Sequence, residues 1–263
     1  MRLLEVKNLK KSFGKSRQKL MAVDGISFHI NEGECLGLVG ESGCGKSTTA
    51  NIIARLVKED EGEIIFDHHE LTSDKWLKPA GKSLQMIFQN PQGSFDPRDT
   101  VLDGIMQGAL SYGIYSNEEL KKRALEIFEY VGLKESYAGV KTSELSGGEC
   151  QRAAIARAVI GEPKLLICDE ATSALDVLVQ AQIIDLLKRL KKEKDMSMLF
   201  ITHDLPLAAA LCDRIAVMDQ GKIIEEDETQ RILKSPEHWQ TQNLIASVLP
   251  VSVNMKNALK EQD

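Results

Sequence analysis

The sequence lacks a run of eighteen or more apolar residues, and its first residues, 1–7, lack the apolar stretch of a secretory signal. We therefore expect no membrane-spanning segment, so any work at a membrane must involve another chain. An excess of positive charge is also missing, because 33 Lys and Arg stand against 39 Asp and Glu and give a net charge of −6. This acidic balance argues against nucleic acid as the main partner, since phosphate backbones bind to basic surfaces.

Cysteines are few, and their spacing suggests no pairing. No two of them form a C-x-x-C pair, which predicts reduced thiols without a disulfide framework or a cysteine metal site. His68 and His69 have no third candidate ligand nearby, so a loop pair facing solvent is favoured over a metal site. The five cysteines are Cys35, Cys44, Cys150, Cys168 and Cys212, of which Cys168 lies in an apolar run.

The chain is long enough for one globular α/β domain with an inserted lobe, at 263 residues, 43% hydrophobic and 27% charged. Strand-like segments alternate with helical ones, which predicts a mainly parallel sheet. Helices are expected at 46–56, 148–160 and 179–191, and the block 90–160 is dominated by helical sequence. Asn117 is the expected N-cap of one further helix, whose apolar face carries Leu120, Ala124, Ile127 and Val131. The predicted strands are 3–6, 26–30, 35–39, 63–66, 84–88, 165–168, 198–201 and 215–218.

A glycine-rich segment follows the apolar run 35–39 and precedes a predicted helix. It fits the pattern G-x-x-x-x-G-K-[ST], in which glycines turn the backbone tightly and direct amide N–H groups at phosphate oxygens. Lys46 then supplies a charge to the β- and γ-phosphates, and Ser47 a hydroxyl to Mg²⁺. In this context an ATP site is favoured over a glycine-rich turn with a solvated lysine. Its residues are Gly40, Glu41, Ser42, Gly43, Cys44, Gly45, Lys46, Ser47 and Thr48.

Two adjacent carboxylates end the apolar run 165–168. We assign Asp169 to the Mg²⁺ shell and Glu170 to the water that attacks ATP. Gln89 follows the predicted strand 84–88, where its amide can contact both the metal and the water. His203 follows the strand 198–201 and can bond the γ-phosphate. Taken alone, a solvated turn, a loop glutamine and a structural histidine are ordinary alternatives, but beside a phosphate loop the catalytic interpretation is stronger.

Further segments resemble motifs of ATP-binding-cassette proteins, and the resemblance covers residues 1–250. The sequence Leu-Ser-Gly-Gly-Glu at 145–149 resembles the LSGGQ signature, 173–176 the D-loop, and 202–204 the switch histidine. The resemblance implies an α/β fold: a P-loop NTPase core with a mainly parallel sheet, an N-terminal antiparallel β subdomain and an inserted α-helical subdomain. It places the ATP-binding core at 1–89 and 161–235, the helical subdomain at 90–160 and a C-terminal tail at 236–263.

In that family the signature of one subunit closes over ATP held by the phosphate loop of the other. The resemblance therefore implies nucleotide contacts in trans. A helix beginning at this signature would present bare amides and a positive dipole end to the arriving γ-phosphate. The residues implied are Ser146, Gly147, Gly148 and Glu149, together with Asp176 of the D-loop.

Two positions leave alternatives open. Glu149 stands where the family usually has glutamine. Its carboxylate favours its own helix dipole by roughly 0.3–1 kcal/mol but repels a partner's nucleotide, so we hypothesise a weakened composite site on this side. Titrating ATP-driven dimerisation of Glu149→Gln tests the hypothesis, and an unchanged affinity would refute it. Phe13 matches the family's adenine-stacking aromatic, while an ordinary buried phenylalanine fits nearly as well.

A narrower resemblance is carried by residues 88–98, FQNPQGSFDPR, which are similar to the FQDPxxSLNPR segment of ATPases from peptide and nickel importers. It implies Mg²⁺-dependent ATP hydrolysis that drives import of peptides or nickel-like metal complexes, at the cytoplasmic face of the membrane. The implied partners are separate permease subunits, a second ATPase (a heterodimer in the cell, with a homodimer possible in isolation) and, indirectly, an extracytoplasmic substrate-binding protein. Because no cysteine-bearing extension follows, no iron–sulfur cluster is expected.

Other classes of ATPase remain as alternatives. A DNA-repair or chromosome-organising ATPase interrupts its head with a long coiled coil, and no sustained heptad run occurs here. A translation-associated nucleotide switch pairs two cassettes in one chain. An exporter often fuses its membrane-spanning helices to the cassette. The acidic charge, the single cassette and the segment after Gln89 favour the importer.

Overall fold

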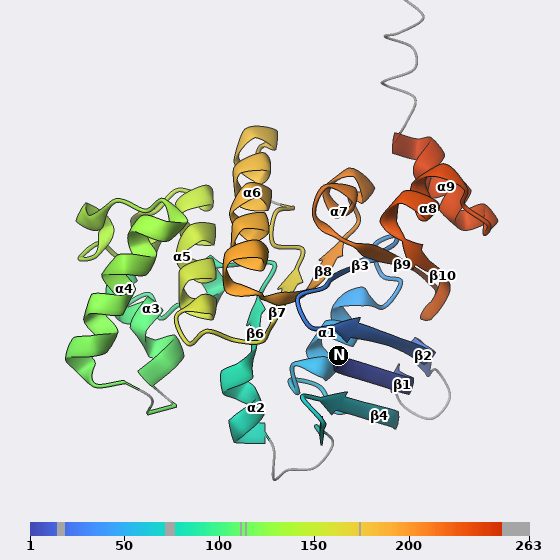
Figure 1. Cartoon of the computed structure of the whole chain (residues 1–263), viewed down its shortest axis with the longest axis horizontal. Coiled ribbons are helices and arrows are strands. Elements are labelled where there is room, and N and C mark those ends of the chain that lie inside the picture. The colour runs from blue at the N-terminus through green and yellow to red at the C-terminus, as the bar shows by residue number, and fades with distance from the viewer. Residues whose placement is uncertain (15–18, 72–76, 111, 114, 174, 249–263) are drawn as a thin grey trace, which may run out of the picture.

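The computed structural model in Figure 1 describes residues 1–14, 19–71, 77–110, 112–113, 115–173 and 175–248. Its strands form two sheets. The antiparallel sheet has the order β2-β1-β4-β5, with β1 at Arg2–Phe13, β2 at Leu20–Asn31, β4 at Glu61–Phe66 and β5 at His69–Glu70. The other has the order β10-β9-β3-β8-β7-β6, with β3 at Cys35–Val39, β6 at Leu84–Ile87, β7 at Leu165–Asp169, β8 at Ser197–Thr202, β9 at Arg214–Asp219 and β10 at Lys222–Glu228.

The described helices cover the six-stranded sheet and form a lobe beside it (Figure 1). Three of them, α3, α4 and α5, pack together in that lobe. A short 3₁₀ turn at 92–94 precedes α3, and two more, at 135–137 and 142–144, lie between α4 and α5. The helices are α1 (Lys46–Ile53), α2 (Leu77–Ser83), α3 (Val101–Leu110), α4 (Asn117–Val131), α5 (Gly147–Val159), α6 (Val177–Lys194), α7 (Leu205–Leu211), α8 (Thr229–Lys234) and α9 (Trp239–Val248).

The predicted parallel sheet is confirmed for five of its six strands, since only β10 runs antiparallel, to β9. All five residues of β3 are buried, as are all five of β7 and all six of β8, which is typical of parallel strands covered on both faces. Their carboxyl ends meet at one edge of the sheet. This edge therefore collects the segments after β3, β6, β7 and β8, where the predicted phosphate and hydrolysis residues lie.

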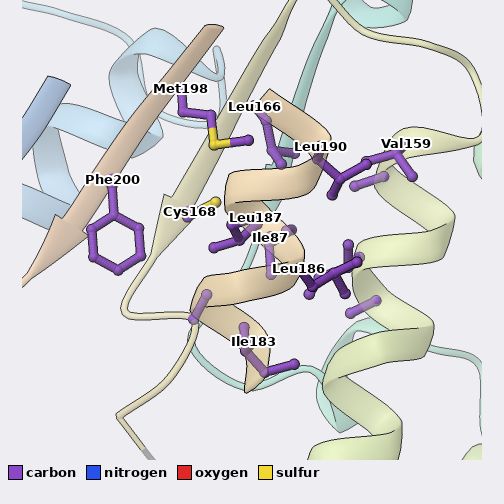
Figure 2. Packing of buried hydrophobic residues seen from close by; sticks show 14 of the residues in the cluster. Ile87, Val159, Leu166, Cys168, Ile183, Leu186, Leu187, Leu190, Met198 and Phe200 are labelled. Atoms are coloured by element: carbon purple, nitrogen blue, oxygen red, sulfur yellow. The ribbon is translucent and has the colours of Figure 1, made fainter. Parts of the chain in front are cut away.

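Helix α6 covers one face of the sheet with apolar residues at helical spacing. Figure 2 shows Leu186 and Leu190 directed toward Val159 of α5, and Leu187 close to Cys168 of β7. Each such buried leucine contributes roughly 1.5–3 kcal/mol of hydrophobic stabilisation. The opposite face packs with α1 and the antiparallel sheet through a second buried cluster that includes Ile52. The edge that carries the site is thus held rigidly from both faces.

Several local predictions need correction. The N-cap of α4 is Ser116 and not Asn117, because Ser116 Oγ accepts from the N–H of Glu119 while the Glu119 carboxylate accepts from the N–H of Ser116. The buried face of α4 includes Phe128, whereas Ile127 is only partly buried. His69 lies half-buried in β5, so of the two histidines only His68 is exposed as expected.

The region after 235, assigned from the sequence to a tail, contains a helix. Residues 239–248 form α9, which packs against α7 and buries Ile245. The polar stretch 254–263 lies outside the described residues. The strand β10 and the short helices α7 and α8 were not predicted, because β10 alternates charged and apolar residues weakly and the two helices have fewer than two turns each.

Candidate functional site

The predicted phosphate loop joins β3 to α1 at the carboxyl edge of the parallel sheet. Gly45 has φ +112°, and a Cβ there would lie 2.1 Å from the main-chain oxygen of Ala22, so only glycine fits. The loop leads into the N-terminus of α1 at Lys46, whose backbone N–H groups are available to an anion. The backbone is thus shaped as the G-x-x-x-x-G-K-[ST] pattern predicts.

Lys46 is a buried ammonium group without a salt bridge to any described residue. Its side chain is only 4% exposed, and Nζ donates to the main-chain oxygens of Gly40 and Glu41, each at 2.8 Å. No carboxylate among the described residues forms a salt bridge with it. A buried charge ordinarily requires a counter-charge, so this loop is completed by a negatively charged ligand.

Cys44 lies inside the same loop, with its sulfur 3.7 Å from Lys46 Nζ. Burial raises the pKa of the Cys44 thiol, although the neighbouring ammonium opposes this effect. The thiol therefore stays protonated and acts as a small packing group rather than a nucleophile.

An open pocket of about 770 Å³ extends from this loop. Phe13 lies in its wall and is 44% exposed, which excludes the alternative of an ordinary buried phenylalanine. Exposed apolar side chains of Leu20 and Met21 flank it. The pocket therefore joins an apolar end, suited to a flat base, to a cationic end, suited to phosphates. Gln89 and Glu170 also line it.

The two carboxylates after β7 have different environments. Asp169 is 6% exposed and accepts from Ser47 Oγ at 2.9 Å. Burial raises the pKa of Asp169 above its ordinary value, and the nearby Glu170 adds to the rise, while the bond from Ser47 opposes it. A divalent cation at this point would offset the cost of the buried charge. Ser47 and Asp169 supply hard oxygen ligands, which suit Mg²⁺.

Glu170 lies where three strand ends meet. Its carboxylate accepts from Gln89 Nε2 at 2.9 Å and lies 3.5 Å from Nδ1 of His203, so the structure brings these three predicted residues together. Its φ of +47° is unusual for a residue with a side chain. The backbone is held there because its N–H donates to Ile201 and its carbonyl accepts from Ser173, at 3.0 and 3.1 Å.

The signature segment lies apart from this pocket. Ser146 is the N-cap of α5, and the Glu149 carboxylate accepts from its N–H at 2.9 Å and from its hydroxyl at 2.7 Å. Hydrogen bonds from the Tyr137 and Ser146 hydroxyls lower the pKa of Glu149. None of residues 146–149 lines the 770 Å³ pocket. Asp176 does not line this pocket either. Its carboxylate caps α6 by accepting from Val179 N–H at 3.0 Å.

The pocket also has walls that sequence reasoning missed. Leu20 and Met21 at the start of β2 and Gln220 and Gly221 in the β9–β10 turn line it. Gly221 N–H donates to the main-chain oxygen of Cys44 at 2.9 Å, which ties this turn to the phosphate loop. No local motif marks these residues, because their place depends on how the two sheets pack. The described residues contain no group of three His, Cys, Asp or Glu side chains suited to a metal.

Comparison with known proteins fits this geometry. A model of the ABC transporter family matches residues 23–173. The chain is 42% identical to the oligopeptide transport ATP-binding protein OppF of Bacillus subtilis, over 99% of this chain and 87% of that protein. This chain belongs to the ABC transporter family. It is also 41% identical to OppF of Escherichia coli, over 93% of this chain and 74% of that protein.

Solved structures of ABC cassettes have the same fold. The dimeric ATP-binding cassette MJ0796 in a post-hydrolysis state, bound to ADP and Pi, superposes with a TM-score of 0.79 at 33% identity, covering 86% of this chain and 98% of that one. CbiO1 of Clostridium perfringens gives a TM-score of 0.81 at 26% identity, covering 99% of each chain. As an ABC transporter ATP-binding subunit, the protein binds ATP and is an ATPase coupled to transport. No helix in the described part of the chain is long and apolar enough to cross a membrane.

Proposed function

We propose that this ABC ATPase energises the import of oligopeptides through a separate membrane permease. The observation that carries the proposal is the match, at 40–42% identity over nearly the whole chain, to proteins named as oligopeptide transport ATP-binding proteins. The resemblance of residues 88–98 left peptides and nickel complexes open, and these names favour peptides. They give no support to a role in DNA repair, chromosome organisation or translation.

The proposed hydrolytic roles follow from the contacts of each residue. Glu170 polarises the attacking water, because Glu170 lines the phosphate pocket and its left-handed backbone conformation is held in place. His203, half-exposed beside Glu170, bonds the γ-phosphate. Gln89 alternates between Glu170, its partner in this structure, and the nucleotide side of the pocket. Phe13 stacks on the adenine.

We also propose a Mg²⁺ site on Ser47, Asp169 and Gln89. The close approach of the Ser47 hydroxyl to the buried Asp169 carboxylate supports it, as does the raised pKa of Asp169. A bound Mg²⁺ would neutralise phosphate charge during hydrolysis. The protein's own contribution is to hold these oxygen atoms at the end of the phosphate loop.

The composite site is proposed to need a second ATPase subunit. The solved cassette MJ0796, which shares this fold, is dimeric. In this chain the signature residues Ser146 to Glu149 are exposed or half-exposed and lie off their own pocket, which supports a contact in trans. The proposed partner in the cell is a different but related ATPase, with homodimers possible in isolation. ATP can drive closure of the two subunits only if it binds the closed pair more tightly than the open pair.

The remaining partners are a permease and, indirectly, an extracytoplasmic substrate-binding protein. We propose that the helical lobe at 90–160 and the groove near Gln89 face the permease, which places the chain at the cytoplasmic side of the membrane. A pull-down of the chain from detergent-solubilised native membranes, with partners identified by mass spectrometry, tests this. Permease subunits and a second cassette ATPase are expected. Recovery of soluble or nucleic-acid partners alone would overturn the import proposal.

A further inference from the structure

Gln151, on α5, is a buried amide with an unused hydrogen-bond donor. Its side chain is 2% exposed, and Nε2 has no hydrogen-bond partner among the residues that the structure describes. Such a group has lost its bonds to water without replacement, so it destabilises the fold and is rare in native proteins. Its persistence in the first turns of the helix that begins at the signature calls for a functional explanation.

The Gln151 side chain lines a cavity of about 220 Å³ between α5 and the catalytic edge of the sheet. Gly147, one helical turn earlier, lies on the same face of α5 and lines it too. The opposite walls are the segment 89–92 after β6 and the loop after β7 that begins at Glu170. This cavity therefore connects the signature helix to Gln89 and Glu170, the two residues proposed to act on water and metal.

The same segment is fastened to α5 at another point. Arg157 donates to the main-chain oxygen of Ser94 and, at 2.8 Å, to its hydroxyl, and its guanidinium lies 4.3 Å over the ring of Phe95. Arg157 lies six residues beyond Gln151, which is about 9 Å along a helix. The segment 89–95 is thus hydrogen-bonded to α5 at Ser94, whereas beside Gln151 no hydrogen bond between the described residues links it to α5.

In this structure Gln89 Nε2 donates to Glu170 Oε2 at 2.9 Å. Gln89 is proposed above to move to the nucleotide side of the pocket, which breaks this bond and leaves Oε2 to the attacking water. We propose that Gln151 is a positioning residue that stabilises the displaced position of Gln89. When Gln89 moves away from Glu170, the segment 89–92 turns about Ser94 and accepts a hydrogen bond from Gln151 Nε2. One hydrogen bond is exchanged for another, and Glu170 is released to the water.

The inference rests on the proposed role of Glu170 and extends it to the signature helix. Because α5 is a continuous helix from Gly147, a contact made at its N-terminus is carried to Gln151 within about one turn. The nucleotide of a partner subunit would then favour the released state of Glu170. The donor that is unpaired in this structure would have its partner only in the hydrolytic arrangement.

The test replaces Gln151 with Met, which has a similar length and no donor. ATP turnover is measured with the chain alone or with the subunits recovered from native membranes, whichever hydrolyses ATP. We expect kcat to fall about tenfold, as for loss of one hydrogen bond, with the Kd of ATP within about twofold. The thermal midpoint should stay or rise, because the thioether buries no unpaired donor. A wild-type kcat, with or without a lower midpoint, would overturn the proposal.

Gln230→Met is the matched control, since Gln230 lies exposed on α8, outside both the pocket and the helical lobe, and should leave kcat unchanged. The double variant Gln89→Ala with Gln151→Met should be no slower than Gln89→Ala alone, because Gln151 acts through Gln89; a further tenfold loss would contradict this. Gln151→Asn, which keeps the amide but shortens it, gives the same expected loss if the Met variant does not fold. Glu170→Gln separates the two proposals. If this variant retains turnover, the proposed role of Glu170 is refuted. If it is inactive while Gln151→Met keeps the wild-type kcat, only the positioning role of Gln151 is refuted.

Discussion

Replacing Glu170 with Gln removes the proposed general base while preserving its shape. In this structure the Glu170 carboxylate accepts from Gln89 and lies near His203, and the amide oxygen of a glutamine can take over the first contact. A hydrogen bond to a charged acceptor is worth about 1 kcal/mol more than one to a neutral acceptor, so the fold should lose about that much. The loss is partly offset, because the charge of Glu170 also raises the pKa of the buried Asp169.

We therefore expect the unfolding midpoint of Glu170→Gln to change by no more than about 2–4 °C, the shift for 1 kcal/mol in a chain of this size. The kcat for ATP should fall about 10²–10⁴-fold, equivalent to about 2.7–5.4 kcal/mol of activation free energy. ATP binding should persist, because the phosphate loop is untouched.

The assay combines steady-state phosphate release with size-exclusion chromatography in the presence and absence of ATP. An ATP-stabilised dimer or heterodimer should accumulate in the variant, since the clamp closes and is not released. Turnover within threefold of the wild type would refute the role of Glu170, whatever the dimer does. A midpoint lowered by 10 °C or more would show instead that the residue is mainly structural.

Three further predictions follow from the contacts described above. Lys46→Ala should weaken ATP binding by at least tenfold, because it removes a buried ammonium that forms no salt bridge with any described residue, and isothermal titration would show this; unchanged affinity would contradict it. Because burial raises the Asp169 pKa, the folded chain keeps a proton that the unfolded chain releases, so stability falls as pH rises from the unfolded pKa through the folded one. Asp169→Asn should flatten that slope and raise the nucleotide-free midpoint at neutral pH while abolishing turnover; a lower midpoint would refute it. Ser116→Ala should cost about 1 kcal/mol through loss of the α4 capping box, seen as a midpoint about 2–4 °C lower with unchanged kcat, and no change would show that the cap is not stabilising.

The sequence-based predictions of helices and strands were correct where a single physical effect determined the local sequence pattern. The run at 35–39 matched β3 to the residue, because a strand buried on both faces is apolar throughout. The N-cap of α4 was misplaced by one residue, since Ser116 and Asn117 are both good caps and only the reciprocal bond to Glu119 decides between them. The edge that carries the candidate site was predictable, because each of Gln89, Glu170 and His203 lies one or two residues after the end of a strand.

What the sequence could not reveal depends on packing between distant segments. Met21 and Gln220 line the pocket because the start of β2 lies against the β9–β10 turn, where Asp24 N–H donates to Gly221 at 2.8 Å. The open position of Phe13 in that wall has the same origin. Gln151 reads as an ordinary helix residue, and only its burial without a partner, seen in the fold, marks it.

Four unfavourable features of the fold lie at the edge of the sheet that carries the candidate site. Among the described residues, Lys46 is a buried charge without a salt bridge, Asp169 has a raised pKa, Glu170 has a left-handed backbone, and Gln151 has an unpaired donor. Each would cost about 1–3 kcal/mol in the nucleotide-free fold. Nucleotide phosphates and the proposed metal ion would supply charges that two of these groups lack. A moved Gln89 segment would supply an acceptor for a third, so binding would relieve costs that folding alone leaves in place. The site is therefore built to be stable when occupied and closed, which is the energetic condition for ATP to drive a conformational change.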